Sequence, residues 1–468
     1  MVFSSSVFLF IFLPIVLCGY YLIQPRFRNA FLLLASLCFY GYGEPKFLLA
    51  LLSSILINYL VALLISREEK AANKKILLTA GVALNLSLLF VFKYLNFLTF
   101  NLSRLIPSIG VTSIALPIGI SFFTFQAMSY VIDVYRGERA QKNPLNLGLY
   151  ISLFPQLVAG PIVRYKTIES QIDDRKTSFA DFSEGVVVFL KGLFKKIIFA
   201  NNMAIIADKA FSGDAAGHSV LFLWLGALAY TLQIYFDFSG YSDMAIGLGR
   251  MFGFSFPKNF DHPYIAKSIT DFWRRWHISL SSWFRDYVYI PMGGSRGSTA
   301  QHLRNLAVVW LLTGIWHGAN WTFLFWGLAY FVLLVLEKYL IRPERFESKG
   351  LVWSYRLVTF LAVMFCWVVF RADSITSAGS YLASMLGFSG NPLSDGDWLF
   401  YSREYLILIV FALVFCTQLP HAAAERVRSK LKASVFEAAR AVAYVFLFAV
   451  CISYLVIGSH NPFIYFNF

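Results

Sequence analysis

The sequence has 468 residues, of which 58% are hydrophobic and 14% are charged, and its mean hydropathy is +0.62. A soluble domain carries about a quarter charged residues, so this composition excludes that class of protein. Long apolar runs without strand-like alternation predict an all-α polytopic membrane protein and exclude a β-barrel.

The formal net charge is +14, from 40 Lys and Arg against 26 Asp and Glu. Such an excess is typical of the cytoplasmic loops of membrane proteins. Because the basic residues are dispersed through short loops, we expect membrane lipid as a partner and no nucleic acid. A polyanionic substrate or a phosphate-bearing cofactor at the cytoplasmic face is compatible with the charge. The five cysteines show no metal or redox spacing, so no metal site is predicted.

The N-terminal part predicts helices that cross the membrane from an outside start. The first apolar run reaches Ile23 without a cleavage site, which predicts a retained helix rather than a signal peptide. Basic residues after this run and between Ser66 and Lys75 place both loops in the cytoplasm. Further apolar runs that predict helices cover residues 30–42, 47–65 and 76–92.

Prolines and polar groups interrupt the middle of the chain. Pro107, Pro117, Pro155 and Pro161 divide apolar runs, which predicts short, tilted or re-entrant segments that are buried in protein or line a cavity. Polar residues in or beside such segments are Gln126, Asp133, Gln156, Gln233, Asp237, Asp243 and Asn320. They indicate an internal polar path, so we expect a hollow helical bundle.

The C-terminal part combines an interfacial region with further spans. Residues 253–297 lack a spanning run and are expected to form cytoplasmic or interfacial helices. Spans are predicted at residues 185–199, 221–236, 304–316, 319–338, 353–370, 404–419 and 440–458. A basic loop at Arg426 is expected in the cytoplasm, which leaves residues 459–468 as a periplasmic tail and both termini periplasmic. We predict a single integral-membrane domain over residues 1–468.

His317 and Asn320 stand between two apolar runs and among tryptophans that include Trp316. Ionisable groups inside a membrane are costly, so His317 is a candidate functional residue. The alternative is a histidine satisfied by a carbonyl at a helix end, beside an interfacial belt of tryptophans.

Residues 268–287 are the second informative stretch. Ser268 and Asp271 have the spacing of a helix capping box. Positions three and four apart that form one apolar face are Trp273, Trp276, His277, Leu280, Phe284 and Tyr287. This pattern predicts an amphipathic helix whose arginines bind lipid headgroups or, as guanidinium groups can, a phosphate. His277 and His317 are then candidates for a base and its partner at one site.

The residues that carry a family resemblance are Trp-Arg-Arg-Trp-His-Ile-Ser-Leu-Ser at 273–281 and Trp-His-Gly-Ala-Asn at 316–320. With them, the chain resembles the membrane-bound O-acyltransferase (MBOAT) family, and more narrowly its bacterial branch of alginate O-acetyltransferase membrane subunits. Residues 1–5, 116–122, 236–245 and 461–468 fit the same resemblance, which covers nearly the whole chain.

The resemblance implies a ring of tilted and re-entrant helices around a transmembrane tunnel in a bacterial inner membrane. It implies catalytic roles for His317, as general base, and for His277, which orients the donor or stabilises developing charge. The implied donor is cytoplasmic acetyl-CoA. The implied acceptor is an exported polysaccharide of the alginate or cellulose type, reached through a periplasmic partner acetyltransferase.

Other residues receive supporting roles from the same resemblance. Donor contacts are expected from Trp273, Arg274, Arg275 and Arg285, with the arginines on the CoA phosphates. Tunnel or supporting positions are expected for Gln126, Gln233, Asp243, Trp316 and Asn320. Tyr465 in the tail is a docking residue for the partner or a transient acyl carrier. Docking is favoured because a tyrosine hydroxyl, with a pKa near ~10, needs activation before it reacts.

Two alternatives stay open at this point. One is another acyl group or acceptor within the family, as in D-alanyl or peptidoglycan O-acyltransferases. The other is a secondary transporter or permease, which also has broken helices and buried polar groups. Transporters of that kind usually contain two related halves, whereas the histidine motifs here occur once.

Overall fold

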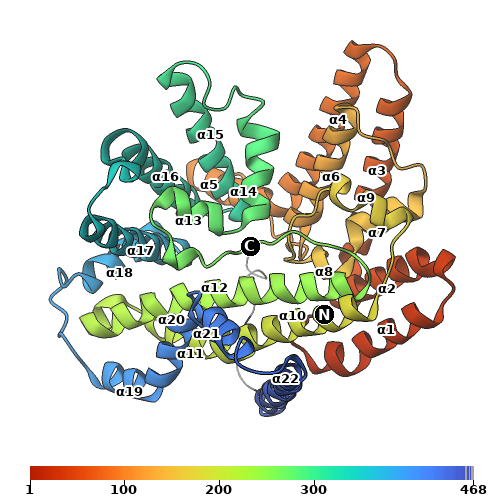
Figure 1. Cartoon of the computed structure of the whole chain (residues 1–468). Helices are drawn as coiled ribbons and strands as arrows, with labels where there is room; N and C mark the ends of the chain where they lie inside the picture. The colour runs from red at the N-terminus through yellow and green to blue at the C-terminus, as the bar shows by residue number, and fades with distance from the viewer. Residues whose placement is uncertain (459–460, 463, 465–468) are drawn as a thin grey trace. The chain divides into compact units, whose positions relative to one another are not determined.

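The structure is a computed structural model that describes residues 1–458, 461–462 and 464, and every regular element among them is helical (Figure 1). This confirms the all-α prediction. The chain divides into two compact units. Unit 1 comprises Met1–Phe189 and Tyr241–Pro257, and unit 2 comprises Leu190–Gly240 and Lys258–Phe468. The boundaries fall inside α10 (Phe179–Phe194), inside α12 (Val220–Met251) and between Pro257 and Lys258.

In unit 1, helix α6 packs against both α3 and α4, and α2 packs against α7. The helices are α1 (Leu13–Leu22), α2 (Arg28–Gly43), α3 (Leu48–Arg67), α4 (Ala71–Leu89), α5 (Leu95–Leu105), α6 (Ile120–Tyr135), α7 (Pro144–Ser152), α8 (Phe154–Leu157) and α9 (Tyr165–Asp173). Asn58 on α3 and Asn85 on α4 exchange amide hydrogen bonds of 3.0 and 2.8 Å, which fixes the register of these apolar helices. The short α7, α8 and α9 agree with the short segments predicted around the prolines.

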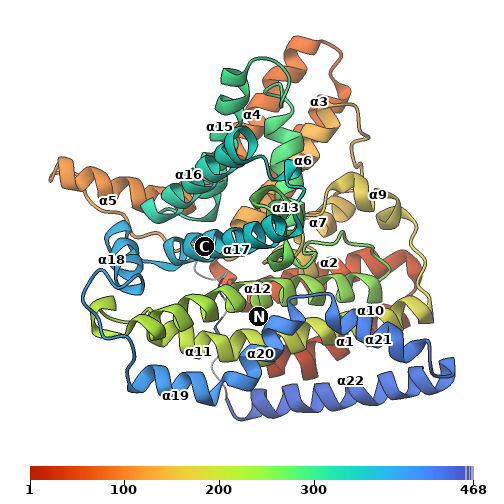
Figure 2. The same ribbon diagram turned by 60° about the vertical axis from the view of Figure 1, so that its left-hand side comes forward.

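Unit 2 contains the remaining helices, of which α15 and α16 form a tightly packed hairpin (Figure 1). They are α11 (Asn201–Ala210), α13 (Ile269–Arg275), α14 (Ile278–Phe284), α15 (Thr299–His317), α16 (Trp321–Leu336), α17 (Lys349–Arg371), α18 (Ile375–Met385), α19 (Gly396–Glu404), α20 (Leu406–Phe415), α21 (Leu419–Arg428) and α22 (Ala433–Val456). Three π-helical turns extend helices of this unit: η5 (Lys195–Ala200), η8 (Arg285–Tyr289) and η9 (Glu337–Ile341). Figure 2 shows α19 to α22 gathered together.

Six described helices are long and apolar enough to cross a membrane, and a bent pair adds a seventh candidate. They cover Pro45–Arg67, Ala71–Leu105, Val220–Met251, Trp321–Arg345, Lys349–Arg371 and Ala433–Val456, with Gly396–Glu404 and Leu406–Phe415 as the pair bent by 59°. These helices confirm a multi-pass membrane protein. The predicted spans at 185–199 and 304–316 are helical but are not among the six, because polar residues shorten their apolar stretches. The tunnel and the orientation of the termini stay predictions.

Two glycines let the hairpin helices approach closely. A Cβ atom at Gly314 on α15 would meet the carbonyl oxygen of Phe323, and one at Gly327 on α16 would meet that of Trp310. Small residues at these positions bring the two backbones together, as is usual for helix pairs in membranes. The hairpin therefore holds its connecting residues 318–320 in a defined position.

Candidate active site

His277 stands at a break between two short helices rather than within one continuous amphipathic helix. Helix α13 begins at its N-cap Ser268, whose side chain accepts from the Asp271 backbone N–H as predicted, and ends at Arg275. His277 then adopts the left-handed conformation, with φ 45° and ψ 53°, before α14 starts. Such a conformation is costly for a residue with a Cβ atom and persists only when its surroundings impose it.

Backbone pairing with residues 259–261 holds this break. The Ile278 N–H donates to the Asn259 carbonyl at 2.9 Å, and the Asp261 N–H donates to the Arg275 carbonyl at 2.9 Å. The paired segment also supplies the Asn259 side chain, whose Oδ1 lies 3.2 Å from Nδ1 of His277. A contact between residues this distant in sequence explains why the local pattern did not predict the break.

Asn259 fixes the proton position on the His277 ring. Its Oδ1 accepts from the Ser279 backbone N–H at 3.1 Å and from the Ser279 hydroxyl at 2.9 Å, so this atom is the amide oxygen and an acceptor. Nδ1 of His277 must therefore carry its proton, which leaves the lone pair on Nε2. The ring is fully buried, and this burial lowers the pKa of His277 to about 3. His277 is consequently a neutral imidazole in the physiological range.

His317 is the last residue of α15 and is 4% exposed. The connection that follows is anchored by Asn320. Its Oδ1 accepts from the Thr322 N–H at 3.2 Å at the start of α16, and its Nδ2 donates to the Asp373 carbonyl at 3.0 Å. Asn320 thus ties the end of the hairpin to the segment after α17, and its supporting role in the reaction stays a prediction.

The structure brings the two histidines together on one tryptophan. The Trp316 ring lies 5.8 Å from the His277 ring and 5.0 Å from the His317 ring, measured between centroids. His317 also contacts Trp326 at 5.1 Å and Phe370 at 5.2 Å. Both histidines are buried and contact the same tryptophan, and their pairing at one catalytic site stays a prediction.

Buried indole groups near His317 leave hydrogen-bond donors for a ligand. Trp273 lies 5.7 Å from Trp326, and Trp326 contacts His317. Both Nε1 atoms are buried, and no acceptor lies within hydrogen-bonding distance among the described residues. Unsatisfied buried donors are rare and often mark the position of a ligand or an ordered water. These two N–H groups can donate to a carbonyl oxygen of a ligand.

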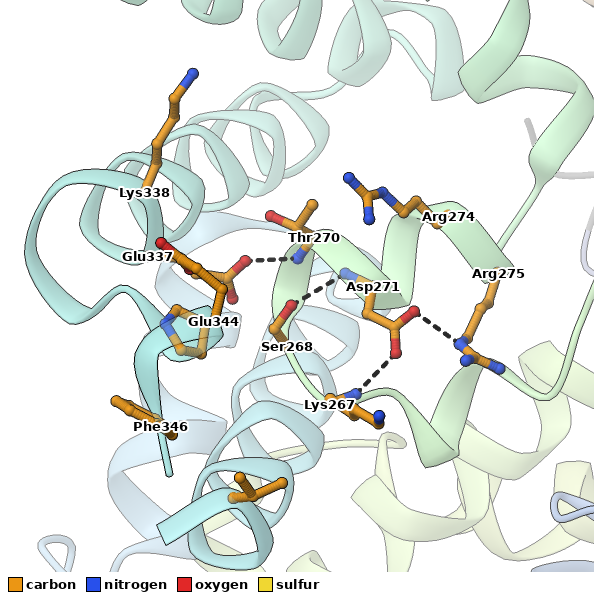
Figure 3. A pocket seen from close by; sticks show the side chains of 12 residues that line it. Lys267, Ser268, Thr270, Asp271, Arg274, Arg275, Glu337, Lys338, Glu344 and Phe346 are labelled. Carbon is orange, nitrogen blue, oxygen red and sulfur yellow. Dashed lines mark hydrogen bonds and ion pairs between the residues drawn. The ribbon is translucent and has the colours of Figure 1, made fainter. Parts of the chain in front are cut away.

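A cavity of about 780 Å³ opens beside α13 and carries several charged groups (Figure 3). Its charged lining residues are Lys267, Asp271, Arg274, Arg275, Glu337, Lys338 and Glu344. Arg275 is paired with Asp271 at 2.9 Å. Arg274 is exposed, and no carboxylate of the described residues lies within 4 Å of its guanidinium. Arg274 is therefore the arginine in this cavity best placed to bind an anion.

The buried Glu337 on η9 holds the start of α13. Its carboxylate accepts from the backbone N–H groups of Ile269 at 2.6 Å and Thr270 at 2.9 Å, and from the Tyr355 hydroxyl at 3.1 Å. Figure 3 shows the contact with Thr270. Negative charge at a helix N-terminus is stabilising. Glu337 therefore fixes the helix that carries Trp273 and Arg274.

A second cavity, of about 340 Å³, lies at the opposite end of α17. Its polar lining includes Asp214, Arg371, Asp373, Ser374, Ser377 and Ser380. Arg371 pairs with Asp208 at 2.7 Å. Its neighbour Phe370 contacts His317 at 5.2 Å, so this cavity adjoins the histidine cluster.

Some of the predicted residues are not among those that line the two cavities. Arg285 is exposed, pairs with Asp286 at 2.7 Å and does not line either cavity. Gln233 is buried on α12 in unit 2, whereas Gln126 and Asp243 belong to unit 1. Tyr465 lies outside the described residues. No group of three or more metal-ligating side chains occurs among the residues described.

Three residues of the site were missed from the sequence: Asn259, Ser279 and Glu337. Asn259 lies in a loop without a motif, and Ser279 is an ordinary polar position. Glu337 is the one with a visible signal, because it directly follows the apolar run that ends at Leu336. An acid at the end of such a run needs a partner, and here its partners are backbone N–H groups.

Comparison with known proteins agrees with this arrangement. Residues 36–380 match the model of the MBOAT, membrane-bound O-acyltransferase family. The chain is 46% identical over 416 residues to the probable alginate O-acetylase AlgI of Azotobacter vinelandii, covering 84% of this chain and 80% of that protein. It is 39% identical over 428 residues to the peptidoglycan O-acetyltransferase of Helicobacter pylori, covering 83% and 80%. The teichoic acid D-alanyltransferase of Bacillus subtilis is 31% identical over 263 residues, covering 53% and 65%.

These matches, together with the apolar spans and the buried histidine pair, identify a multi-pass membrane acyltransferase. The chain belongs to the membrane-bound O-acyltransferase family. The family resemblance carried by residues 273–281 and 316–320 is confirmed.

Proposed function

We propose that the chain moves acetyl groups from cytoplasmic acetyl-CoA across a bacterial inner membrane for O-acetylation of an exported polysaccharide of the alginate or cellulose type. The acetyl group reaches the polysaccharide through a periplasmic partner acetyltransferase. Support for this acceptor class comes from the alginate O-acetylases, which are 46% and 45% identical to the chain over most of its length.

One observation carries the proposal: the histidine cluster lies in unit 2 with cavities at both ends of α17. The larger cavity includes Val352 near the start of this helix, and the smaller includes Arg371 at its end. A helix of 23 residues is about 34 Å long, close to the ~30 Å thickness of a bilayer core. The two cavities therefore suit a donor at one membrane face and an acceptor at the other.

His317 acts as the general base in this proposal. Its imidazole takes the proton of the acceptor hydroxyl as the hydroxyl oxygen attacks the thioester carbonyl carbon. The C–S bond then breaks, and the departing CoA thiolate takes the proton back from His317. The acetyl group ends as an oxygen ester, and the histidine returns to its neutral form.

The tautomer of His277 selects between its two predicted roles. With the proton on Nδ1 held by Asn259, Nε2 accepts hydrogen bonds and cannot donate one to a developing oxyanion. His277 therefore orients a substrate N–H or O–H group, and the indole N–H of Trp326 is the donor for the thioester oxygen. Arg274 binds a phosphate of CoA in the larger cavity.

Oriented vesicles test the direction and the donor together. Everted inner-membrane vesicles containing the chain, the partner and the polymer receive labelled acetyl-CoA on the outside, which is the former cytoplasmic face. The proposal expects labelled polymer inside these vesicles and none in right-side-out vesicles of the same membranes. Equal labelling in both orientations, or labelling from a different acyl donor alone, overturns the proposal.

The relatives also favour a second candidate within the family. Peptidoglycan O-acetyltransferase of Helicobacter pylori covers as much of the chain as the alginate enzymes do. Supplying peptidoglycan fragments and polysaccharide in separate vesicle reactions decides between these acceptors. The transporter alternative has no relative among the proteins compared above, and the family match speaks against it.

A further inference from the structure

A buried ion pair in unit 2 is not used by the proposed reaction. Lys196 on η5 and Asp237 on α12 contact each other at 2.7 Å, and their side chains are 3% and 1% exposed. Asp237 lies near the middle of α12, which is one of the candidate membrane spans. Charges at such a depth are costly and are retained where they serve a function.

The C-terminal segment completes the hydrogen bonding of this pair. The Ile464 backbone N–H donates to Oδ2 of Asp237 at 2.9 Å, while Oδ1 of the same carboxylate contacts Lys196. The Lys196 ammonium also donates to the Pro462 carbonyl oxygen. The Ile464 side chain is 8% exposed and therefore buried.

The C-terminal segment contacts the two charged residues through its main chain. One of its side chains makes an additional contact. Asn201 on α11 donates through Nδ2 to Oδ1 of Asn461 at 3.2 Å. A carboxylate that accepts a main-chain N–H and an ammonium that donates to a main-chain carbonyl together bind an extended peptide. This mode resembles other recognition of peptides through their backbone, with specificity added by a few side chains.

We infer that Lys196, Asp237 and Asn201 form a peptide-binding site whose ligand is the chain's own C-terminal segment, of which the structure describes Asn461, Pro462 and Ile464. These contacts bind the segment in cis as an exchangeable ligand. The same peptide supplied separately therefore binds a chain that lacks the segment.

The test uses the full membrane chain with a protease site inserted between Gly458 and Asn461, so that the segment is cut only after folding. Excess labelled peptide of residues 459–468 is added in detergent, and its exchange for the cut segment is measured by fluorescence anisotropy. The control peptide carries an N-methyl group on the Ile464 nitrogen, which removes the donor to Asp237 and leaves the side chains unchanged. We expect the N-methyl peptide to bind roughly ten-fold or more weakly, as for loss of a hydrogen bond to a charged group.

A chain ending at Gly458 provides a second, equilibrium measurement. We expect this chain to bind the peptide with a stoichiometry of one, and Asn201→Ala to weaken the binding. Equal binding of both peptides, or no binding to a chain whose thermal unfolding matches that of the full chain, overturns the inference. If the shortened chain does not fold, the exchange measurement on the cut full-length chain tests the inference. A cut segment that does not exchange with the added peptide is part of the core, and the inference is then wrong.

Discussion

Replacing Asn259 with alanine tests the assignment of the His277 tautomer. Three donors converge on the Asn259 side-chain oxygen: Nδ1 of His277, the Ser279 N–H and the Ser279 hydroxyl. In Asn259→Ala they lose their common acceptor inside a fully buried site. A buried donor left unsatisfied costs about 1–3 kcal/mol, so we expect a measurable loss of stability even after partial rearrangement.

The expected effect of Asn259→Ala on acetyl transfer follows from the loss of the hydrogen bond to the His277 imidazole. Without Asn259 the proton exchanges between Nδ1 and Nε2 of His277, and the ring loses its fixed orientation. A loss of about 1.4–2.7 kcal/mol of transition-state stabilisation corresponds to a roughly 10- to 100-fold slower reaction. We expect this decrease mainly in kcat. Asn259→Asp keeps the acceptor oxygen and is expected to retain more activity than the alanine variant.

A double-mutant cycle separates positioning from general damage. The rates of labelled acetyl transfer are compared for wild type, Asn259→Ala, His277→Gln and the double variant, at equal amounts of folded protein. Because Asn259 acts through His277, the double variant should be no slower than His277→Gln alone. Two losses that simply multiply would refute the reasoning, since Asn259 would then act independently of the histidine.

Three further predictions concern other parts of the site. Arg274→Ala should raise KM for acetyl-CoA roughly 2- to 10-fold with little change in kcat. The effect is modest because Arg274 is exposed, and exposed charges contribute little binding energy. Arg285→Ala is the control and should leave both constants unchanged in the same transfer assay. Gly314→Ala should lower the thermal unfolding midpoint in detergent, because its Cβ atom meets a backbone carbonyl of α16; an unchanged midpoint would contradict the close packing. Below about pH 6.5 the unfolded chain takes up a proton at His277, but the folded chain does so only near pH 3, so stability falls through this window. At pH 5.5 this loss is about 1.3 kcal/mol relative to pH 7, and His277→Gln should remove that part of the pH dependence; identical profiles would show that His277 is not kept neutral.

The membrane architecture was predictable because it follows from composition along the chain. The apolar run at 353–370 became α17, and that at 319–338 became α16 with η9. The capping signal at Ser268 was also local and correct. The hairpin around His317 followed from apolar runs on both sides of one polar turn. In each case the physical cause lies within about twenty residues of the element, so the sequence alone contains it.

The break at His277 could not be predicted, because its cause lies in residues 259–261. The periodic aromatic pattern of residues 268–287 favours one helix, and the left-handed conformation appears only through pairing with that distant segment. Asn259 was missed for the same reason. The arginines were predicted as a group from their residue type alone. Of Arg274 and Arg285, the structure places only Arg274 at the cavity. Which side chains face one cavity depends on tertiary packing.

Transfer of labelled acetyl groups from acetyl-CoA by the wild type and by His317→Ala tests the central claim most directly. Both are measured in membranes with partner and polymer present, at matched amounts of folded protein. His421→Ala, which changes an exposed histidine on α21, is the control. We expect transfer by the wild type and the control and near-complete loss in His317→Ala. Transfer at the wild-type rate by His317→Ala would contradict the central claim, because the reaction would then need a different base.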